Sequence, residues 1–232
     1  MGATVSGKVS LPFDEPLIPL AERGVIWAAD VCNAAELHRI MREISEELVM
    51  VKVGHPLLWS CGIGIISEIR DQYKLPVIAD AKLCDVPDLI EMEVSILYGA
   101  GADGVLVVGL AGNESVRRAV RLDPRRMVYV FTEFTHSGGL VDEELSEQCA
   151  KMARAAGAHG IQAPGTRAKR VAELRRVVGT ELKIMCCGIG IQGGEAGSAV
   201  EMGANYEIVG RAITTAPDPK LIAKQIRSRI GQ

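Results

Sequence analysis

Charged side chains interrupt apolar segments in the first half of the sequence. Lys52 lies within one apolar run, and another run leads directly into Asp80 and Lys82. Because an unpaired charge is costly to bury, we expect these ammonium and carboxylate groups to pair. A lysine about 4 Å from a carboxylate gains roughly 4 kcal/mol at an effective dielectric constant of about 20, which favours its protonated form. Such a lysine is an acid and a poor nucleophile, so the pattern argues against Schiff-base chemistry.

A second group of residues, near the C-terminus, has the composition of an anion-binding site. Residues 187–194 read Cys-Gly-Ile-Gly-Ile-Gln-Gly-Gly, and Gly210 and Arg211 follow the last apolar run. Backbone N–H groups of such turns can bind phosphate, and arginine forms charge-assisted hydrogen bonds with it. Glycine also occurs in turns simply because the chain bends there. The glycines together with Arg211 favour a phosphate site.

Short apolar runs alternate with amphipathic segments along the chain, as strands alternate with helices. We predict eight strands, at residues 25–29, 48–53, 77–80, 104–108, 127–132, 160–162, 183–186 and 206–209. Predicted helices include residues 35–44, 63–73, 89–98, 143–155, 171–178, 195–202 and 219–230. The expected fold class is α/β, a single (β/α)8 TIM barrel. An open dinucleotide-binding sheet is the alternative, but it would usually carry a glycine-rich turn after its first strand, and residues 29–33 carry none.

Length and composition limit the classes of protein that this chain can be. With 232 residues it is long enough for one barrel, and we expect a flexible tail at residues 1–16 and a single domain at residues 17–232. The net charge of −3 argues against nucleic-acid binding, and no apolar stretch approaches the roughly 20 residues of a membrane span. The six cysteines lack metal-ligand spacing, which indicates a reducing, cytoplasmic compartment and no protein-built metal site.

An ordered series of motifs, spanning roughly residues 24–230, resembles the orotidine 5′-phosphate decarboxylase family, especially its compact archaeal-type form. The series consists of Asp30 and the segments 51–57 (VKVGHPL), 78–87 (IADAKLCDVP), 132–136 (TEFTH), 163–167 (APGTR), 190–194 (GIQGG) and 209–211 (VGR). A lone D-x-K-x-x-D pattern has modest specificity, whereas the ordered series is specific. The resemblance implies conversion of orotidine 5′-phosphate to uridine 5′-phosphate, a step of de novo pyrimidine biosynthesis, with no cofactor.

The resemblance also implies catalytic roles for four charged residues. Lys82 would deliver a proton to C6 of the pyrimidine as carbon dioxide leaves, and Asp80 would face the departing carboxylate and hold Lys82. Lys52 would bind a ribose hydroxyl. Asp85 and its neighbour Val86 would act in the active site of a partner subunit, which implies a homodimer with shared active sites.

The remaining implied roles are in substrate binding. Asp30 would bind a ribose hydroxyl, Thr135 would contact the pyrimidine, and Gln192 would bridge the pyrimidine and the phosphate. Gly210 and Arg211 would hold the phosphate. The other substrate-binding positions implied by the match are Cys187, Gly190 and Gly193.

Two alternative functions stay open at this point. The related sugar-phosphate enzymes, 3-keto-L-gulonate 6-phosphate decarboxylase and hexulose-6-phosphate synthase, share D-x-K-x-x-D but bind magnesium and carry glutamate at the position of Lys52. Lys52 and Gln192 therefore favour the nucleotide substrate. Leu89 and Ile90 stand where the family motif usually has threonine and asparagine, which motivates a second alternative, a non-catalytic phosphate-binding barrel. The complete set of charged residues argues against a non-catalytic barrel, because charges that are buried without a function lower the stability of the protein.

Overall fold

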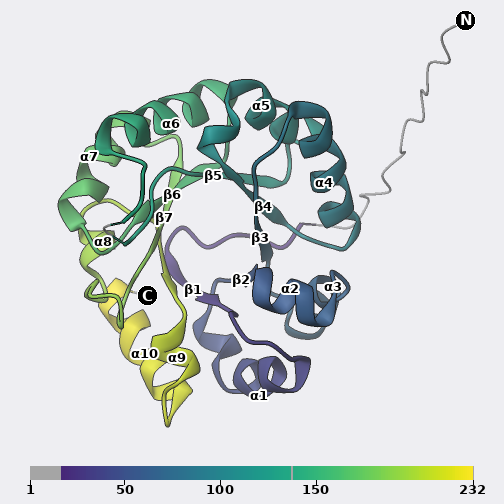
Figure 1. Ribbon diagram of the computed structural model, residues 1–232. Helices are drawn as coiled ribbons and strands as arrows, with labels where there is room; N and C mark the ends of the chain where they lie inside the picture. The colour runs from purple at the N-terminus through teal and green to yellow at the C-terminus, as the bar shows by residue number, and fades with distance from the viewer. Residues whose placement is uncertain (1–16, 137, 232) are drawn as a thin grey trace, which may run out of the picture.

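The fold is a closed barrel of parallel strands surrounded by helices (Figure 1). The computed structural model describes residues 17–136 and 138–231, so the expected tail at residues 1–16 lies outside the described residues. Each strand pairs with the next in the sequence, and β8 closes the barrel against β1. The strands are β1 (Gly24–Ala28), β2 (Met50–Gly54), β3 (Val77–Leu83), β4 (Gly104–Val108), β5 (Met127–Phe131), β6 (Gly160–Pro164), β7 (Lys183–Cys187) and β8 (Tyr206–Val209). The prediction of a single (β/α)8 barrel is confirmed.

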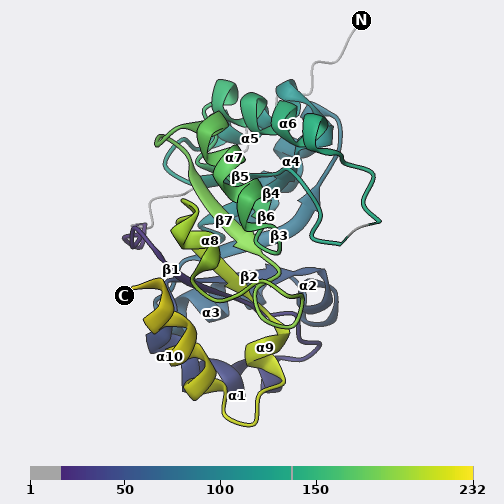
Figure 2. The same cartoon turned by 90° about the vertical axis from the view of Figure 1, so that its left-hand side faces the viewer.

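Helices occur in all of the amphipathic segments named above, although residues 195–202 contain only the short α8. The helices are α1 (Ala34–Ile44), α2 (His55–Cys61), α3 (Ile65–Tyr73), α4 (Pro87–Gly99), α5 (Asn113–Leu122), α6 (Glu143–Ala156), α7 (Ala168–Val178), α8 (Ser198–Glu201), α9 (Arg211–Thr214) and α10 (Pro219–Ile230), with 3-10 turns η1 (Ser45–Glu47) and η2 (Gly109–Ala111). The C-terminal α10 packs beside α1, which closes the outer ring of helices (Figure 2).

Alternation along each strand divides the buried residues into two layers. On β1, Val25 and Trp27 belong to the larger cluster between the sheet and the helices, whereas Ile26 and Ala28 belong to the smaller cluster inside the barrel. Side chains of a strand point alternately to its two faces, so the inward positions of neighbouring strands stack in layers. This alternation determines which polar residues enter the barrel.

Candidate active site

A pocket of about 220 Å³ opens at the carboxyl ends of the strands. The segments after β1, β5, β7 and β8 form its wall, and inward residues of β2, β3 and β6 also line it. Nine of the residues singled out in the sequence line this pocket: Asp30, Lys52, Asp80, Lys82, Thr135, Cys187, Gln192, Gly210 and Arg211. The two groups that lie far apart in the sequence therefore meet at one site.

Three charged side chains form a connected array in the pocket. Lys52 Nζ lies 2.5 Å from Asp80 Oδ2, and Lys82 Nζ lies 2.6 Å from Asp80 Oδ1. Asp80 is 2% exposed and Lys52 is 6% exposed, whereas the Lys82 side chain is 34% exposed. The carboxylate of Asp80 therefore bridges one buried ammonium group and one ammonium group that faces the pocket.

The array stabilises its own charged state. Burial alone would lower the pKa of Lys52, but the negative charges of Asp80 and Asp30 outweigh it and raise that pKa above its usual value. Burial alone would raise the pKa of Asp80, but the two ammonium groups hold it below its usual value. Both groups are ionised at neutral pH, so Asp80 accepts hydrogen bonds and does not donate them.

The backbone at Lys82 departs from regular strand geometry. Its φ is +45°, in the left-handed region, and the pairing of β3 with β4 shifts register between Ala79 and Leu83. A non-glycine residue in that region is strained, and such strain is found preferentially at functional positions. The bulge places Lys82 Nζ 5.7 Å from the centre of the Phe131 ring, within the range of a cation–π contact.

Asp30 reaches the array because Gly54 leaves room for it. A Cβ atom at Gly54 would lie 2.7 Å from Asp30 Oδ1, closer than real contacts allow. The charge of Asp30 is one of the causes that raise the pKa of Lys52. Any side chain at position 54 would displace Asp30 from the pocket.

The expected phosphate site is formed by two adjoining segments. The loop after β7 has positive φ at Gly188, Gly190 and Gly193, and Arg211 begins α9 directly after β8. A Cβ atom at Gly190 would lie 2.7 Å from Cβ of Ala212, so this loop packs directly against the start of α9. Gly190 and Gly193 do not line the pocket themselves, but they allow the turn that brings Gln192 to it.

A buried carboxylate supports this loop from behind. Glu207 on β8 is fully buried and accepts hydrogen bonds from the backbone N–H groups of Gly197 (2.9 Å) and Ala199 (3.1 Å) at the start of α8. Burial raises the pKa of Glu207 above its usual value, while these backbone donors oppose that shift. The apolar pattern of β8 is interrupted because the glutamate ties the end of the β7 loop to the barrel.

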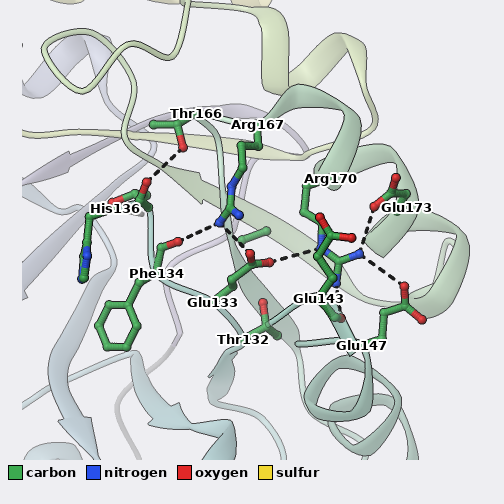
Figure 3. A network of polar contacts seen from close by, with 12 residues as sticks. Thr132, Glu133, Phe134, His136, Glu143, Glu147, Thr166, Arg167, Arg170 and Glu173 are labelled. Carbon is green, nitrogen blue, oxygen red and sulfur yellow. Dashed lines mark hydrogen bonds and ion pairs between the residues drawn. The ribbon is translucent and has the colours of Figure 1, made fainter. Parts of the chain in front are cut away.

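The loop after β5, which carries Thr135, is held by arginines near the start of α7 (Figure 3). The buried Glu133 carboxylate contacts Arg167 Nη2 at 2.6 Å and Arg170 Nε at 3.2 Å. Arg167 also donates to the carbonyl oxygen of Phe134 at 2.9 Å, and Thr166 Oγ1 donates to the carbonyl oxygen of Thr135 at 3.4 Å. The pocket-lining part of this loop is therefore fixed to the next βα unit.

Asp85 and Val86 lie outside this pocket. Both are exposed at the start of α4, where Asp85 Oδ1 accepts a hydrogen bond from the backbone N–H of Val86 at 2.7 Å. They line a separate shallow depression together with Leu110 and Ser115. The chain therefore does not bring Asp85 to its own charged array.

Several residues that line the pocket were not given a role of their own from the sequence. They are mostly apolar residues at strand ends and in the following loops: Ala28, Phe131, Phe134, Gln162, Gly188, Ile189, Ile191, Ile208 and Ala212. Apolar residues there are indistinguishable from core residues in the sequence. Gln162 did carry a signal, because it is a polar residue in an otherwise apolar strand.

Comparison with known proteins agrees with the geometry. The sequence matches a model of the orotidine 5′-phosphate decarboxylase / HUMPS family over residues 23–226. The chain belongs to this family. It is 39% identical to the orotidine 5′-phosphate decarboxylase of Methanosarcina acetivorans over 89% of this chain and 94% of that protein. The enzyme of the same name from Pyrococcus furiosus is 34% identical over 90% of this chain and 98% of its own length.

Solved structures in the family share the fold over almost the whole chain. The orotidine 5′-monophosphate decarboxylase of Methanocaldococcus jannaschii, in complex with the inhibitor BMP, aligns with a TM-score of 0.85 and 30% identity, covering 91% of this chain and 100% of that one. The enzyme from Pyrococcus horikoshii aligns with a TM-score of 0.83 and 33% identity over 90% of this chain. The resemblance inferred from the motifs is confirmed.

Two further observations concern only the described part of the chain. Within residues 17–136 and 138–231, no group of three or more histidine, cysteine, aspartate or glutamate side chains is placed to hold a metal ion. Over the same residues, none of the helices combines the length and the apolar character that crossing a bilayer requires.

Proposed function

We propose that this protein decarboxylates orotidine 5′-phosphate to uridine 5′-phosphate without a cofactor. The observation that carries the proposal is the Lys52–Asp80–Lys82 array in a pocket that Arg211 and Gln192 also line. The chain's membership of the decarboxylase family, with relatives of that name covering nearly its whole length, supports the same function.

In the proposed reaction, Lys82 protonates C6 of the pyrimidine. Loss of carbon dioxide leaves an electron pair on C6, which lacks a conjugated electron sink. A fixed positive charge beside that carbon stabilises the developing negative charge, because the ammonium group is already in position and need not reorganise. Asp80, which accepts a hydrogen bond from Lys82 at 2.6 Å, holds the ammonium group in place. Protonation of C6 from Nζ completes the reaction and leaves a neutral amine that solvent reprotonates.

The rest of the pocket binds the parts of the substrate that do not react. Asp30 and Lys52 bind the ribose hydroxyls, and Thr135 contacts the base. Gln192 bridges the base and the phosphate, and Gly210 and Arg211 hold the phosphate. Cys187, Gly190 and Gly193 shape the wall at the β7 loop. Binding energy from these remote groups positions C6 against Lys82.

A homodimer with shared active sites accounts for the position of Asp85. Four exposed apolar residues at the start of α4 and along it, Val86, Leu89, Met92 and Ile96, are spaced three or four residues apart and so lie on one face of the helix. A contiguous exposed apolar face of this kind marks a protein–protein interface. If a second copy covers this face, Asp85 and Val86 at its end can enter the partner's pocket.

The two alternative functions receive less support. The two relatives compared above are named orotidine 5′-phosphate decarboxylases, and Lys52 lies in the array where the sugar-phosphate enzymes carry glutamate. A barrel without catalytic activity has no need for the paired Lys52 and Asp80, whose burial is costly without a function. We further propose that the protein is cytoplasmic, since its six cysteines are all free.

The decisive assay follows the loss of orotate absorbance after mixing purified protein with orotidine 5′-phosphate, with and without a chelator. We expect turnover that the chelator leaves unchanged and that Lys82→Ala abolishes. Lys74→Ala, at an exposed lysine after α3, is the matched control and should keep full activity. Turnover that requires magnesium, or undiminished turnover by Lys82→Ala, would contradict the proposal.

A further inference from the structure

The strained backbone of Lys82 lies where the regular strand pairing of the barrel is interrupted. The pairing of β3 with β2 ends at Asp80, which lies opposite Gly54. On the other side, the pairing of β3 with β4 shifts register between Ala79 and Leu83. A bulge of this kind takes residues out of the hydrogen-bonded ladder. The peptide unit that precedes Lys82 therefore depends on contacts other than the ladder.

A histidine side chain makes such a contact. His55 Nε2 lies 2.8 Å from the carbonyl oxygen of Ala81. A carbonyl oxygen can only accept a hydrogen bond, so Nε2 carries the proton and donates it. The two residues meet because His55 directly follows Gly54 and Ala81 directly follows Asp80, at the same end of two neighbouring strands.

This hydrogen bond restricts the rotation that sets φ of Lys82. The carbonyl oxygen of Ala81 and the N–H of Lys82 belong to one planar peptide unit, so a bond that holds the oxygen holds the whole plane. The angle φ of Lys82, +45°, is the rotation between that plane and the rest of the residue. His55 thus holds the backbone end of Lys82, while Asp80 holds Nζ at 2.6 Å. A strained residue persists only where its surroundings hold it in this way.

The imidazole ring of His55 is itself held in place. His55 begins α2, and Trp59, four residues later on the same helix, stacks on the imidazole with ring centres 4.7 Å apart and planes 13° from parallel. The stacked indole restricts rotation of the ring and keeps Nε2 directed at Ala81. His55 does not line the pocket, so it affects a bound ligand only through the peptide unit that it holds.

We propose that His55 is a positioning residue that holds the peptide unit between Ala81 and Lys82 and thereby directs Lys82 Nζ to C6 of the pyrimidine. This role rests on the proposed function, in which Lys82 delivers the proton. Misplacing a reacting group by about 1 Å can lower a rate about 100-fold, so loss of the hydrogen bond acts on the chemical step. The groups assigned to the ribose and the phosphate are held by other contacts, and substrate binding is little affected.

The kinetic test separates the hydrogen bond from the ring that makes it. His55→Phe keeps a ring that can stack on Trp59 but has no donor, and His55→Leu lacks both. His55→Gln restores a donor, because Nε2 of glutamine is as many bonds from the backbone as Nε2 of histidine. His38→Phe and His38→Gln are the matched controls, since His38 on α1 is also half-buried and also stacks on an aromatic ring, that of Tyr73, but does not line the pocket.

We expect His55→Phe and His55→Leu to lower kcat about 10- to 100-fold, with the affinity for uridine 5′-phosphate within about twofold of wild type. His55→Gln should recover most of the lost kcat, and both His38 variants should keep the kcat of wild type. Thermal unfolding of every variant is measured in parallel. A residue that only stabilised the fold would lower the unfolding temperature without changing kcat of the folded protein, so the kcat values distinguish the two roles. If His55→Phe does not fold, His55→Leu and His55→Gln carry the comparison.

A second measurement detects the same contact without any substrate. Labelling with carbonyl-13C alanine and 15N lysine selects the NMR signals of the four Ala–Lys peptide units in the chain, at residues 81–82, 150–151, 168–169 and 223–224. The last three lie in α6, α7 and α10, and the Lys82 signal is identified by its loss in Lys82→Arg. We expect His55→Phe and His55→Leu to shift the Lys82 signal and His55→Gln to shift it less, while the other three signals stay in place.

Wild-type kcat in both His55→Phe and His55→Leu would overturn the proposal, as would a Lys82 signal that none of the His55 variants moves. A kcat of His55→Gln as low as that of His55→Phe would also overturn it, because the N–H donor would then not be the group that matters. Failure of the proposed function gives a different result. A wild-type protein that does not turn over orotidine 5′-phosphate refutes that function, whereas a Lys82 signal that moves as expected leaves the contact between His55 and Ala81 standing.

Discussion

Replacing Asp80 with asparagine removes the one negative charge that contacts both Lys52 and Lys82 while nearly preserving the shape of the side chain. The main cost falls on Lys52, which is 6% exposed and loses an ion pair of 2.5 Å. Leaving one member of a buried pair uncompensated costs about 3 to 5 kcal/mol. Asp30 stays near Lys52 and offsets part of this cost, so we expect the lower end of that range. For a chain of this length, about 3 kcal/mol lowers the unfolding midpoint by roughly 6 to 12 °C.

The loss of stability should depend on pH in a defined way. The pKa of Asp80 is lowered, so its contribution to stability is present above its unfolded pKa and is lost as pH falls through the folded value. The pKa of Lys52 is raised, so its contribution is present below its unfolded pKa and is lost as pH rises through the folded value. The advantage of wild type over Asp80→Asn should therefore be largest between about pH 5 and 9 and should narrow towards both extremes.

Thermal unfolding of Asp80→Asn and wild type across this pH range tests the reasoning. Asp71→Asn, at an exposed position on α3, is the control and should shift the midpoint by less than about 2 °C. Adding Lys52→Met to Asp80→Asn removes the uncompensated ammonium group and should recover part of the lost stability. A midpoint that Asp80→Asn leaves unchanged, or a deficit that stays constant from about pH 2 to about pH 12, would refute the view that charge holds the array together.

Three further predictions concern the loops and the proposed dimer. Arg211→Ala should lower kcat/KM roughly 10- to 100-fold through KM, because charge-assisted hydrogen bonds contribute about 1.5–3 kcal/mol; equal kinetics in wild type and the variant would remove Arg211 from the site. Met92→Lys, on the exposed apolar face of α4, should shift the protein from dimer to monomer in size-exclusion chromatography with light scattering and reduce activity with it; a fully active monomer would refute shared active sites. Glu133→Gln should release the loop that carries Thr135 and lower kcat/KM on the order of 10- to 100-fold, whereas Glu173→Gln, at the more exposed end of the same network, should have little effect; equal losses would show that the network acts only on stability.

The strands and the charged residues on them could be predicted because each leaves a strong local signal. A parallel barrel strand is a short, nearly continuous apolar run, and a charge inside such a run, as at Lys52 or Asp80, requires a partner and hence a site. The α5 helix was not among the predicted helices named from the sequence, although its buried residues, Ser115, Val116 and Ala119, are spaced so that they share one face.

The sequence predicted which residues belong to the site, but it did not predict the backbone geometry that orients them. The sequence placed Lys82 just after a predicted strand that ends at Asp80, but it gave no sign of the positive φ and the shifted register that aim the side chain. These depend on the pairing of β3 with β4, a tertiary property. The position of Asp85 is equally non-local, because Ser115 Oγ on α5 donates to its carbonyl oxygen at 2.8 Å and α4 packs against α5.

The pocket combines a charged array carried by strands with binding groups carried by loops, and the two parts are held in place differently. The sheet places Lys52 and Asp80 on neighbouring strands, and their ion pair of 2.5 Å holds the two side chains together. The loops after β5 and β7 lie beyond the strands, and each is tied down by a buried carboxylate outside the pocket, Glu133 in the first case and Glu207 in the second. Neither carboxylate lines the pocket, yet each carries the burial cost of a charge. A preorganised site stabilises a developing charge more than a site that must rearrange. If catalysis depends on binding groups that are in position when the substrate arrives, this gain offsets the cost of burying the two carboxylates.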